Sequence, residues 1–487
     1  MCVAKSIMIQ GTMSNVGKSL ICTALCRIFT QDGYKVAPFK SQNMALNSYI
    51  TADGMEMGRA QVVQAEAAGK QPDVCMNPIL LKPTNDNGSQ VIVMGKSIGN
   101  MRAAEYYKNK RSFIPYITEA YKKLDDENDI IVIEGAGSPV EINLKENDIV
   151  NMGLAKLLRS PVLLVGDIDR GGVFAQLVGT MELLEAEERN YVKGIIINKF
   201  RGDVNLLTPG IKTLEEHCKK PVFGVVPHIE CDIDDEDSLS ERLFRNDIDG
   251  VIDIAVIKLK RISNFTDFAA LERIDGVSLR YVDKASKIGE PDIVIIPGTK
   301  NTVGDMLLLR QNGIEERIKQ LAEKGTVIFG ICGGFQMLGN TIVDSEGIET
   351  AGTYRGFGLI DMDTVFEKEK KTKRVSGRIN KLDGILKNLS DMEYCGYEIH
   401  MGKSKNDDVI LSGIKNVYGT YIHGIFDKKD ISEGLIKSVA EIKGIKDFKV
   451  HSSDMDEYKN QQYDILADGV RKSLDMNEIY GIIRNGV

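Results

Sequence analysis

The stretch GTMSNVGKS, residues 11–19, decides the first part of the fold. It follows the short apolar run SIMIQ (6–10), and a helix-like spacing of apolar residues begins after Lys18. A strand, a glycine-rich loop and a helix in this order form a phosphate-binding loop, in which backbone N–H groups point at phosphate oxygens. The stretch is one residue longer than the usual loop between its first glycine and its Gly-Lys pair. The extra residue removes none of the required groups, so we predict a nucleotide site here.

Each part of this loop has a physical task. Gly11 and Gly17 allow the tight backbone path, Lys18 can reach the terminal phosphates, and the Ser19 hydroxyl can ligate Mg²⁺. The nucleotide-binding residues that we predict are Gly11, Thr12, Asn15, Val16, Gly17, Lys18 and Ser19.

The strand and helix rhythm continues beyond the loop. Apolar runs that end in Gly, Asp, Asn or Pro recur as DIIVIEGAG (129–137), PVLLVGDID (161–169), VKGIIINKF (192–200) and PVFGVVP (221–227). After an acidic stretch the rhythm restarts with VIDIAVIKL (251–259), PDIVIIPGTKNT (291–302) and GTVIFGICGGFQMLG (325–339). Near-continuous apolar strands that alternate with helices indicate parallel sheets covered on both faces. The sequence therefore predicts an α/β protein with two doubly wound domains whose sheets are mainly parallel.

The same pattern suggests the domain boundaries. We expect a nucleotide-dependent domain over 1–228, an acidic linker over 229–250, a second domain over 251–445 and a helical tail over 446–487. We also expect the charged stretch EKEKKTKR (367–374) to be a surface loop.

The long loop resembles that of the dethiobiotin synthetase-like ATPases, in which ATP phosphorylates a substrate carboxylate. The resemblance implies ATP and Mg²⁺ as cofactors, with Asp53 and Glu134 as further magnesium contacts beside Ser19. Glu134 ends an apolar strand, where a carboxylate can meet a metal at the carboxyl edge of a sheet. Lys40, in PFKSQNM, follows another apparent strand and is a candidate contact to phosphate or substrate. The alternative to a site role is that Asp53 lies on a solvated loop and that Lys40 is an ordinary surface lysine.

The stretch GICGG (330–334) has the pattern of a nucleophile elbow. A sharp turn between a strand and a helix requires small neighbours and pushes the central Cys332 outward, where the helix dipole favours a thiolate. The backbone N–H of Gly333 is placed for an oxyanion hole, and we expect a second donor near Gly298 in PGTKN. A thiolate of this kind needs a general base. Among the five histidines, His423 in YGTYIHGIFD is our candidate and His400 in YCGYEIHMG is its competitor.

The segments PGTKNT, GICGGFQMLG and GTYIHGIFD resemble the signatures of class I glutamine amidotransferases. The resemblance implies that Cys332 forms a glutaminyl thioester and that His423 is its base. Members of that family have Glu two residues after the histidine, whereas this chain has Ile425. A third triad member is therefore absent or supplied from elsewhere in the chain.

From residue 6 to about residue 430 the chain resembles the adenosylcobyric acid synthase family. The segments that carry this resemblance are PFKSQNMALNS, EGAGSPVEINL, DIVNMGLA, GDIDRGGVFAQ, NKFRGD and GYEIHMG. The resemblance implies a glutamine-dependent, ATP-consuming amide ligase of cobalamin biosynthesis. Its expected substrates are glutamine and an adenosylated corrinoid a,c-diamide, several of whose peripheral carboxylates become amides.

Two alternatives stay open. Cobyrinic acid a,c-diamide synthases share both domains, but tend to have GPDYIDP after the lysine that corresponds to Lys40, where this chain has SQNMALNS. The second alternative is a regulatory ATPase with an inactive amidotransferase fold. The intact Cys332 and His423 argue against it.

Composition narrows the class of partner. Lys plus Arg number 62 and Asp plus Glu number 70, giving a formal charge of −8 that argues against nucleic-acid or anionic-membrane binding. No apolar run reaches about 18 residues and the start of the chain lacks a signal-peptide pattern. The cysteines show no zinc spacing. We expect a cytoplasmic enzyme with reduced thiols, and the sequence leaves open whether it forms a homo-oligomer.

Overall fold

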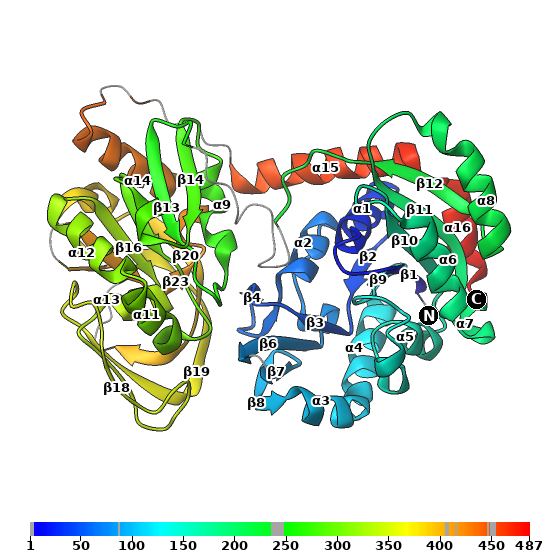
Figure 1. Cartoon of the computed structure of the whole chain (residues 1–487), viewed down its shortest axis with the longest axis horizontal. Helices are drawn as coiled ribbons and strands as arrows, with labels where there is room; N and C mark the ends of the chain where they lie inside the picture. The colour runs from blue at the N-terminus through cyan, green and yellow to red at the C-terminus, as the bar shows by residue number, and fades with distance from the viewer. Residues whose placement is uncertain are drawn as a thin grey trace. The chain divides into compact units, whose positions relative to one another are not determined.

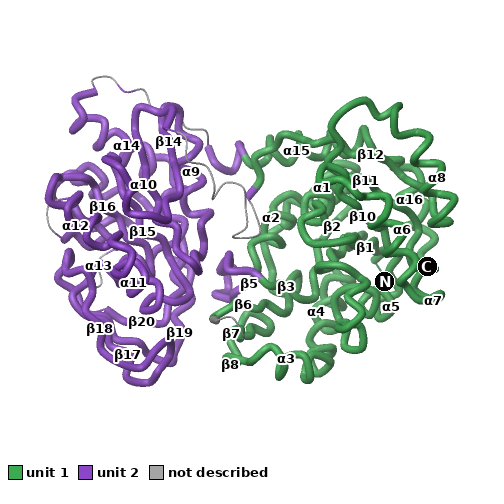
Figure 2. The backbone as a smooth tube through the Cα atoms, in the orientation of Figure 1, with its two compact units in different colours: residues 1–44, 57–233, 459–487 green, residues 45–56, 234–458 purple. Residues whose placement is uncertain are grey.

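The chain forms two compact units, which Figure 2 distinguishes by colour. The computed structural model describes residues 4–85, 88–234, 248–404, 409–413, 416–445, 448 and 454–487. Unit 1 contains Met1–Met44, Met57–Ile233 and Lys459–Val487, and unit 2 contains Ala45–Glu56 and Asp234–Tyr458. Unit 2 thus takes Ala45–Glu56 from the stretch expected to form the nucleotide-dependent domain, and unit 1 takes Lys459–Val487 from the expected helical tail. Residues 235–247, most of the expected acidic linker, lie outside the described residues.

Unit 1 is built on a parallel sheet of six strands in the order β12-β11-β10-β1-β9-β2 (Figure 1). The strands are β1 (Lys5–Gly11), β2 (Val36–Phe39), β9 (Ile130–Glu134), β10 (Val162–Asp167), β11 (Val192–Phe200) and β12 (Val222–Pro227). Ile7, Met8 and Ile9 of β1 are all fully buried, as expected for a central strand covered on both faces. Because the strands are parallel, Gly11, Glu134 and Asp167 end their strands at one edge of the sheet.

Helices cover both faces of this sheet. Val165 of β10 belongs to an apolar cluster with Leu25 and Phe29 of α1 (Lys18–Gln31). The next residue, Gly166, faces the other way, because a Cβ built there would meet Val173 of α6 (Val173–Leu183) at 2.7 Å. Neighbouring residues of a strand point to opposite faces, so α1 and α6 lie on opposite sides.

The end of the chain completes the core of unit 1. Two helices, α15 (Met455–Ser473) and α16 (Met476–Asn485), supply Leu466 and Ile479 to the cluster around α1. A smaller sheet, in the order β3-β6-β7-β8, also belongs to this unit. Its strands are β3 (Gln42–Met44), β6 (Ile79–Asn85), β7 (Gly88–Val93) and β8 (Lys96–Arg102). α2 (Arg59–Ala67) follows the short strand β5 (Glu56–Gly58).

Unit 2 has its own six-stranded sheet in the order β14-β13-β15-β16-β22-β21. Its strands are β13 (Ile252–Ile257), β14 (Val277–Val282), β15 (Ile293–Ile296), β16 (Val327–Ile331), β21 (Leu411–Ser412) and β22 (Val417–Thr420). All pairs are parallel except β21 with β22. The prediction of two α/β parts with mainly parallel sheets is therefore confirmed.

A second sheet in unit 2 corrects one expectation. Residues 367–374, expected to form a surface loop, lie inside the long strand β19 (Asp363–Arg378), which pairs antiparallel with β20 (Glu393–Ser404). Most of the β19 side chains are exposed, so the strand lacks the alternation of apolar and polar residues that identifies a half-buried strand. Within this stretch Lys370 is anchored by an ion pair to Glu56, with Nζ and Oε2 2.6 Å apart.

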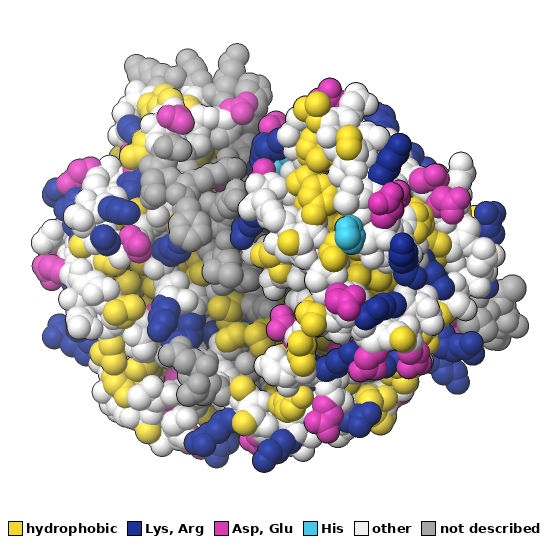
Figure 3. Space-filling view, turned by 45° about the vertical axis from the view of Figure 1, so that its right-hand side comes forward, with side chains coloured by type: hydrophobic (Ala, Val, Ile, Leu, Met, Phe, Trp, Pro, Cys, Tyr) yellow, Lys and Arg dark blue, Asp and Glu magenta, His cyan; other side chains and the backbone are white. Residues whose placement is uncertain are grey.

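Among the described residues, no helix is long and apolar enough to cross a bilayer. On the face shown in Figure 3, lysine and arginine side chains are interspersed with acidic ones and do not gather into one broad basic patch.

Candidate active sites

The nucleotide loop connects β1 to α1 in unit 1, and its glycines are required sterically. Gly17 has φ +94°, in the left-handed region, and a Cβ there would lie 2.1 Å from Asn198 Nδ2. A Cβ on Gly11 would lie 2.4 Å from a methyl carbon of Val16. Asn15 also adopts a positive φ of 62°, a conformation that asparagine tolerates better than most residues. The backbone path therefore explains why small residues and asparagine occupy this loop.

Lys18 curls back across the loop. Its side chain is buried, and Nζ donates hydrogen bonds to the carbonyl oxygens of Met13 at 2.9 Å and Gly137 at 3.1 Å. The ammonium thus lies between the loop and the segment that follows β9. Thr12 donates its hydroxyl hydrogen to Gln176 Oε1 at 3.1 Å.

Glu134, at the end of β9, is the centre of a buried polar cluster. Its Oε1 accepts hydrogen bonds from Ser19 Oγ at 2.9 Å and from Lys40 Nζ at 2.8 Å. Its Oε2 accepts one from Gln64 Nε2 of α2 at 2.5 Å. Glu134 is only 1% exposed, so these partners satisfy a carboxylate that would otherwise be costly to bury. The structure thus brings together three predicted site residues, Ser19, Lys40 and Glu134.

The oxygen atoms of this cluster fit a magnesium ion. The Ser19 hydroxyl and the Glu134 carboxylate are hard oxygen ligands, and Mg²⁺ in nucleotide sites usually takes only one or two protein ligands, with phosphates and water as the others. No group of three or more His, Cys, Asp or Glu side chains suited to a metal is found among the described residues. A metal in unit 1 would therefore depend on the nucleotide for part of its coordination.

Asp53 is not part of this cluster. It belongs to the Ala45–Glu56 segment of unit 2, where its carboxylate accepts a hydrogen bond from the hydroxyl of Thr51. Unit 1 therefore does not bring it to Ser19 and Glu134, and its role as a magnesium contact stays a prediction.

A second carboxylate of the same sheet edge was not among the predicted residues. Asp167 ends β10, is 2% exposed and accepts a hydrogen bond from Lys199 Nζ at 2.8 Å. Lys199 also donates to the Asn15 carbonyl at 2.6 Å, and Asn198 Nδ2 donates to the Val16 carbonyl at 2.8 Å. The polar ends of the strand runs GDID and INKF were the signal that could have identified these residues, because parallel strands end at one edge.

In unit 2, Cys332 lies between β16 and α13 (Gly333–Leu338) and has the strained backbone of an elbow, with φ 52° and ψ −108°. The flanking glycines are sterically obligatory. A Cβ on Gly330 would lie 2.8 Å from the Phe335 nitrogen, and one on Gly334 would lie 2.0 Å from the Ile296 carbonyl oxygen. The Cys332 thiol donates to the Ile399 carbonyl at 3.5 Å. Since α13 has only six residues, the main charge partner of a Cys332 thiolate must be a side chain.

His423 is that side chain. It ends β23 (Ile422–His423), is 1% exposed, and its pKa is raised in part by the neighbouring Cys332. On its other side, Nδ1 lies 2.7 Å from Oδ2 of Asp267, a buried residue of the 3₁₀ helix η6 (Phe265–Phe268). Asp267 Oδ1 also accepts the Gly424 backbone N–H at 3.0 Å. Sequence reasoning missed Asp267, which lies 156 residues before His423 and in no recognisable motif.

The surroundings favour a protonated His423. Burial disfavours the charged ring, but the Asp267 carboxylate and Cys332 outweigh it and raise the pKa of His423 to about 10. An imidazolium beside a thiol stabilises the thiolate, which is the nucleophilic form of cysteine. The Tyr397 ring stacks on His423, with centroids 5.4 Å apart and planes at 20°. The arrangement Cys332–His423–Asp267 is therefore compatible with a nucleophile, a base and an orienting carboxylate.

The two predicted oxyanion-hole residues lie next to this group. A Cβ on Gly298 would lie 3.1 Å from Cε1 of His423, and one on Gly333 would lie 3.2 Å from the backbone nitrogen of Thr299, the neighbour of Gly298. The loop after β15 and the elbow thus face each other beside the ring of His423.

His400 is occupied by its own strand. Its Nδ1 lies 2.6 Å from the Gly402 carbonyl oxygen and its Nε2 lies 3.3 Å from Glu398. Its ring stacks on Tyr421 with centroids 3.9 Å apart. This geometry favours His423 over His400 as the partner of Cys332.

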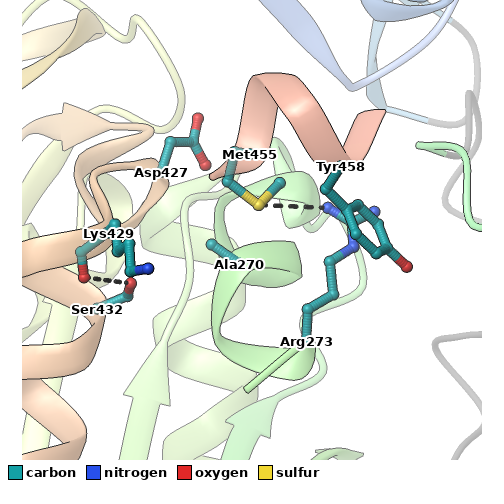
Figure 4. Close-up of a pocket in the computed structure, with 7 residues that line it drawn as sticks. All are labelled: Ala270, Arg273, Asp427, Lys429, Ser432, Met455 and Tyr458. Carbon is teal, nitrogen blue, oxygen red and sulfur yellow. Dashed lines mark hydrogen bonds between the residues drawn. The ribbon is translucent and has the colours of Figure 1, made fainter. Parts of the chain in front are cut away.

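A small pocket adjoins the elements that follow His423 and Asp267 (Figure 4). It is lined by Ala270, Arg273, Asp427, Lys429, Ser432, Met455 and Tyr458. Arg273 lies over the Tyr458 ring at 4.9 Å and contacts the Met455 sulfur at 3.9 Å. None of the predicted site residues lines it, so we assign it no part in glutamine binding.

Comparison with known proteins gives a family model for each half of the chain. Residues 7–239 match the family model described as a CobQ/CobB/MinD/ParA nucleotide binding domain, and residues 253–431 match a CobB/CobQ-like glutamine amidotransferase domain.

Similarity to curated proteins extends over the whole chain. The cobyric acid synthase of Ruminiclostridium cellulolyticum is 56% identical, with 100% of this chain and 98% of that protein covered. That of Lachnoclostridium phytofermentans is also 56% identical, with 100% of both covered. That of Clostridium acetobutylicum is 53% identical, with 98% of each covered. The chain belongs to the cobyric acid synthase family.

Proposed function

We propose that this chain amidates several peripheral carboxylates of adenosylcobyrinic acid a,c-diamide to give adenosylcobyric acid, with ATP as the energy source and glutamine as the nitrogen source. Membership of the family makes it a glutamine-using, ATP-dependent amide ligase of cobalamin biosynthesis. The observation that carries the proposal is the Cys332–His423–Asp267 group, because it gives the second unit a complete means of releasing ammonia.

In unit 2, the Cys332 thiolate attacks the side-chain carbonyl carbon of glutamine. His423 gives its proton to the departing nitrogen as the carbon–nitrogen bond breaks, leaving a glutaminyl thioester and ammonia. Water, deprotonated by His423, then hydrolyses the thioester to glutamate. The backbone N–H groups of Gly333 and Gly298 would stabilise the oxyanion in both steps, and Asp267 keeps the imidazole oriented.

In unit 1, a carboxylate oxygen of the corrinoid attacks the terminal phosphorus of ATP, and ADP leaves. Ammonia then attacks the acyl carbon of the resulting acyl phosphate, phosphate departs, and an amide remains. A carboxylate is already ionised at neutral pH, so this half needs no strong base. Lys18 and the backbone N–H groups of Gly11 to Ser19 would carry the phosphoryl transfer by position and charge.

The magnesium ion would be held by the Ser19 hydroxyl and the Glu134 carboxylate, and it would supply charge neutralisation on the phosphates. Lys40 shares Glu134 with Ser19, which supports its assignment as a phosphate or substrate contact. Asp53 remains a proposed further magnesium contact.

Two other functions are less well supported. Cobyrinic acid a,c-diamide synthase activity would need other carboxylates as substrates, and 56% identity to cobyric acid synthases over the full chain favours the first reading. A regulatory ATPase without amidotransferase chemistry would not need Asp267, which is buried and bonded to both His423 and Gly424.

The test is a product analysis. The purified chain is incubated with ATP, Mg²⁺, glutamine and either adenosylcobyrinic acid or its a,c-diamide, and the corrinoids are separated and weighed by mass spectrometry. The proposal predicts that the a,c-diamide gains further amides, each replacing a hydroxyl by an amino group. Turnover of the unamidated acid alone would instead favour the a,c-diamide synthase, and no amide on either substrate would favour the regulatory reading.

A further inference from the structure

The segment Ala45–Glu56 interrupts unit 1 in the sequence but packs with unit 2. The chain leaves unit 1 after Met44 and returns at Met57. The segment contains the strand β4 (Ser48–Ile50), which pairs with β5. Cys332, His423 and Asp267 are called the glutaminase group below. Within unit 2 the segment contacts residues that hold each of these three side chains in place.

The first set of contacts fixes the turn that carries Asp267. Ser48 donates its backbone N–H to Asn264 Oδ1 at 3.2 Å, and Asn47 Oδ1 accepts the backbone N–H of Phe265 at 3.3 Å. Asn264 caps the 3₁₀ helix η6 with a left-handed conformation, φ 53°. Asp267 lies two residues after Phe265, so these bonds hold the start of the helix whose carboxylate orients His423.

The second contact reaches His423 through Tyr397. The Tyr397 hydroxyl donates to the Ser48 carbonyl at 3.2 Å and accepts a hydrogen bond from Asn264 Nδ2 at 3.0 Å. The same ring stacks on His423. Tyr397 is 5% exposed and Asn264 is 1% exposed, so water does not readily replace either bond.

The third contact reaches Cys332. Ile50 of the segment forms an apolar cluster with Tyr397 and Ile399. The carbonyl of Ile399 accepts the hydrogen bond from the Cys332 thiol. A displacement of Ile50 would therefore move the strand that places both the ring over His423 and the acceptor for Cys332.

We propose that the Ala45–Glu56 segment positions the glutaminase group through Asn47 and Tyr397. This rests on the proposed function. Asn47 and Tyr397 are positioning residues, because they act through Asp267 and His423.

The test uses the full-length chain and the variants Tyr397→Phe and Asn47→Ala. Tyr397→Phe keeps the ring over His423 and removes only the hydroxyl that joins Ser48 to Asn264. Tyr418→Phe is the matched control, since its hydroxyl also bonds backbone groups, those of Asp383 and Leu386. Glutamine hydrolysis is measured with and without ATP, Mg²⁺ and the corrinoid, together with amidation from free ammonia and the pH profile of Cys332 alkylation by iodoacetamide, read by peptide mass spectrometry.

We expect kcat for glutamine hydrolysis in the presence of ATP, Mg²⁺ and the corrinoid to fall about five-fold or more in each variant. A fall of this size corresponds to the net free energy of one hydrogen bond. KM for glutamine and amidation from ammonia stay unchanged, and the Cys332 alkylation profile moves to higher pH. Tyr418→Phe leaves all of these unchanged.

The proposal is overturned if both variants behave like Tyr418→Phe. It is also overturned if amidation from ammonia falls together with glutamine hydrolysis, because the segment would then support the fold as a whole without positioning the glutaminase group. A wild-type chain that hydrolyses no glutamine under any condition would contradict the proposed function itself, which this design separates from the other two results.

Discussion

Oδ2 of Asp267 lies 2.7 Å from Nδ1 of His423, and both side chains are almost fully buried. We propose that Asp267 takes the place of the glutamate expected two residues after the histidine, where this chain has the buried Ile425. The carboxylate comes from η6, which follows β13, rather than from the strand of His423.

The Asp267–His423 bond predicts a specific pH effect. In Asp267→Asn the carboxylate that raises the pKa of His423 is lost, while burial, which lowers it, remains. The pKa therefore falls from about 10, and protonated His423, which must give a proton to the nitrogen that leaves glutamine, is lost at lower pH. We expect the alkaline limb of kcat/KM for glutamine hydrolysis to move to lower pH and kcat to fall on the order of 10³-fold.

Asp344→Asn is the matched control for that experiment. Asp344 is a buried aspartate of the same unit that accepts backbone N–H groups from Ile348, Glu349 and Thr350. An alkaline limb that stays in place in Asp267→Asn, or moves equally in both variants, would contradict the assignment of Asp267.

The elbow geometry of Cys332 predicts a separation of nitrogen sources. Cys332→Ser should abolish glutamine-dependent amidation and keep amidation with a high concentration of free ammonia, because the acyl phosphate chemistry belongs to the other unit. Cys395→Ser, a free cysteine on β20, should keep both activities. Amidation assays with each nitrogen source decide, and glutamine-dependent turnover by Cys332→Ser would show that another residue is the nucleophile.

The surroundings of the two histidines predict which one is the base. His423→Ala should lose the glutaminyl thioester, whereas His400→Ala should still form it, because His400 bonds Gly402 and Glu398 instead of the cysteine. Acid quenching followed by intact-mass measurement detects the adduct. The reverse pattern would move the base to His400.

The position of Lys18 in the nucleotide loop predicts that Lys18→Ala, unlike Cys332→Ser, loses amidation from free ammonia. Lys18→Ala removes a cation from the nucleotide loop, so amidation should stop with glutamine and with ammonia alike, chiefly through a lower kcat. Lys35→Ala, an exposed lysine beyond the end of α1, should change neither. Retained ammonia-dependent amidation in Lys18→Ala would remove the lysine from the phosphoryl transfer.

The sequence alone was sufficient to predict a site where a short stretch has to satisfy a local steric requirement. The loop from Gly11 to Ser19 and the elbow around Cys332 were both predictable, because the glycines stand where the structure leaves no space for a Cβ. Glu134 was predictable from its place at the end of an apolar run, since parallel strands end at a common edge.

Long-range partners were not predictable in this way. Asp267 carries no local pattern and meets His423 only through the fold, and Gln64 meets Glu134 for the same reason. The Ala45–Glu56 segment has no change of composition at its ends, so nothing in the sequence marks it as part of the other unit. The strand β19 was hidden because exposed charged residues cover most of it.

The central claim is that ATP activates a carboxylate as an acyl phosphate before ammonia from glutamine attacks it. The most direct measurement uses a corrinoid substrate whose peripheral carboxylates carry ¹⁸O, with the isotope followed into inorganic phosphate by mass spectrometry. If the claim is right, each amide formed transfers one labelled oxygen to phosphate, with glutamine or with ammonia as the nitrogen source. Productive amidation that leaves the phosphate free of label would contradict the acyl phosphate, and with it the role of the nucleotide loop in phosphorylating the corrinoid.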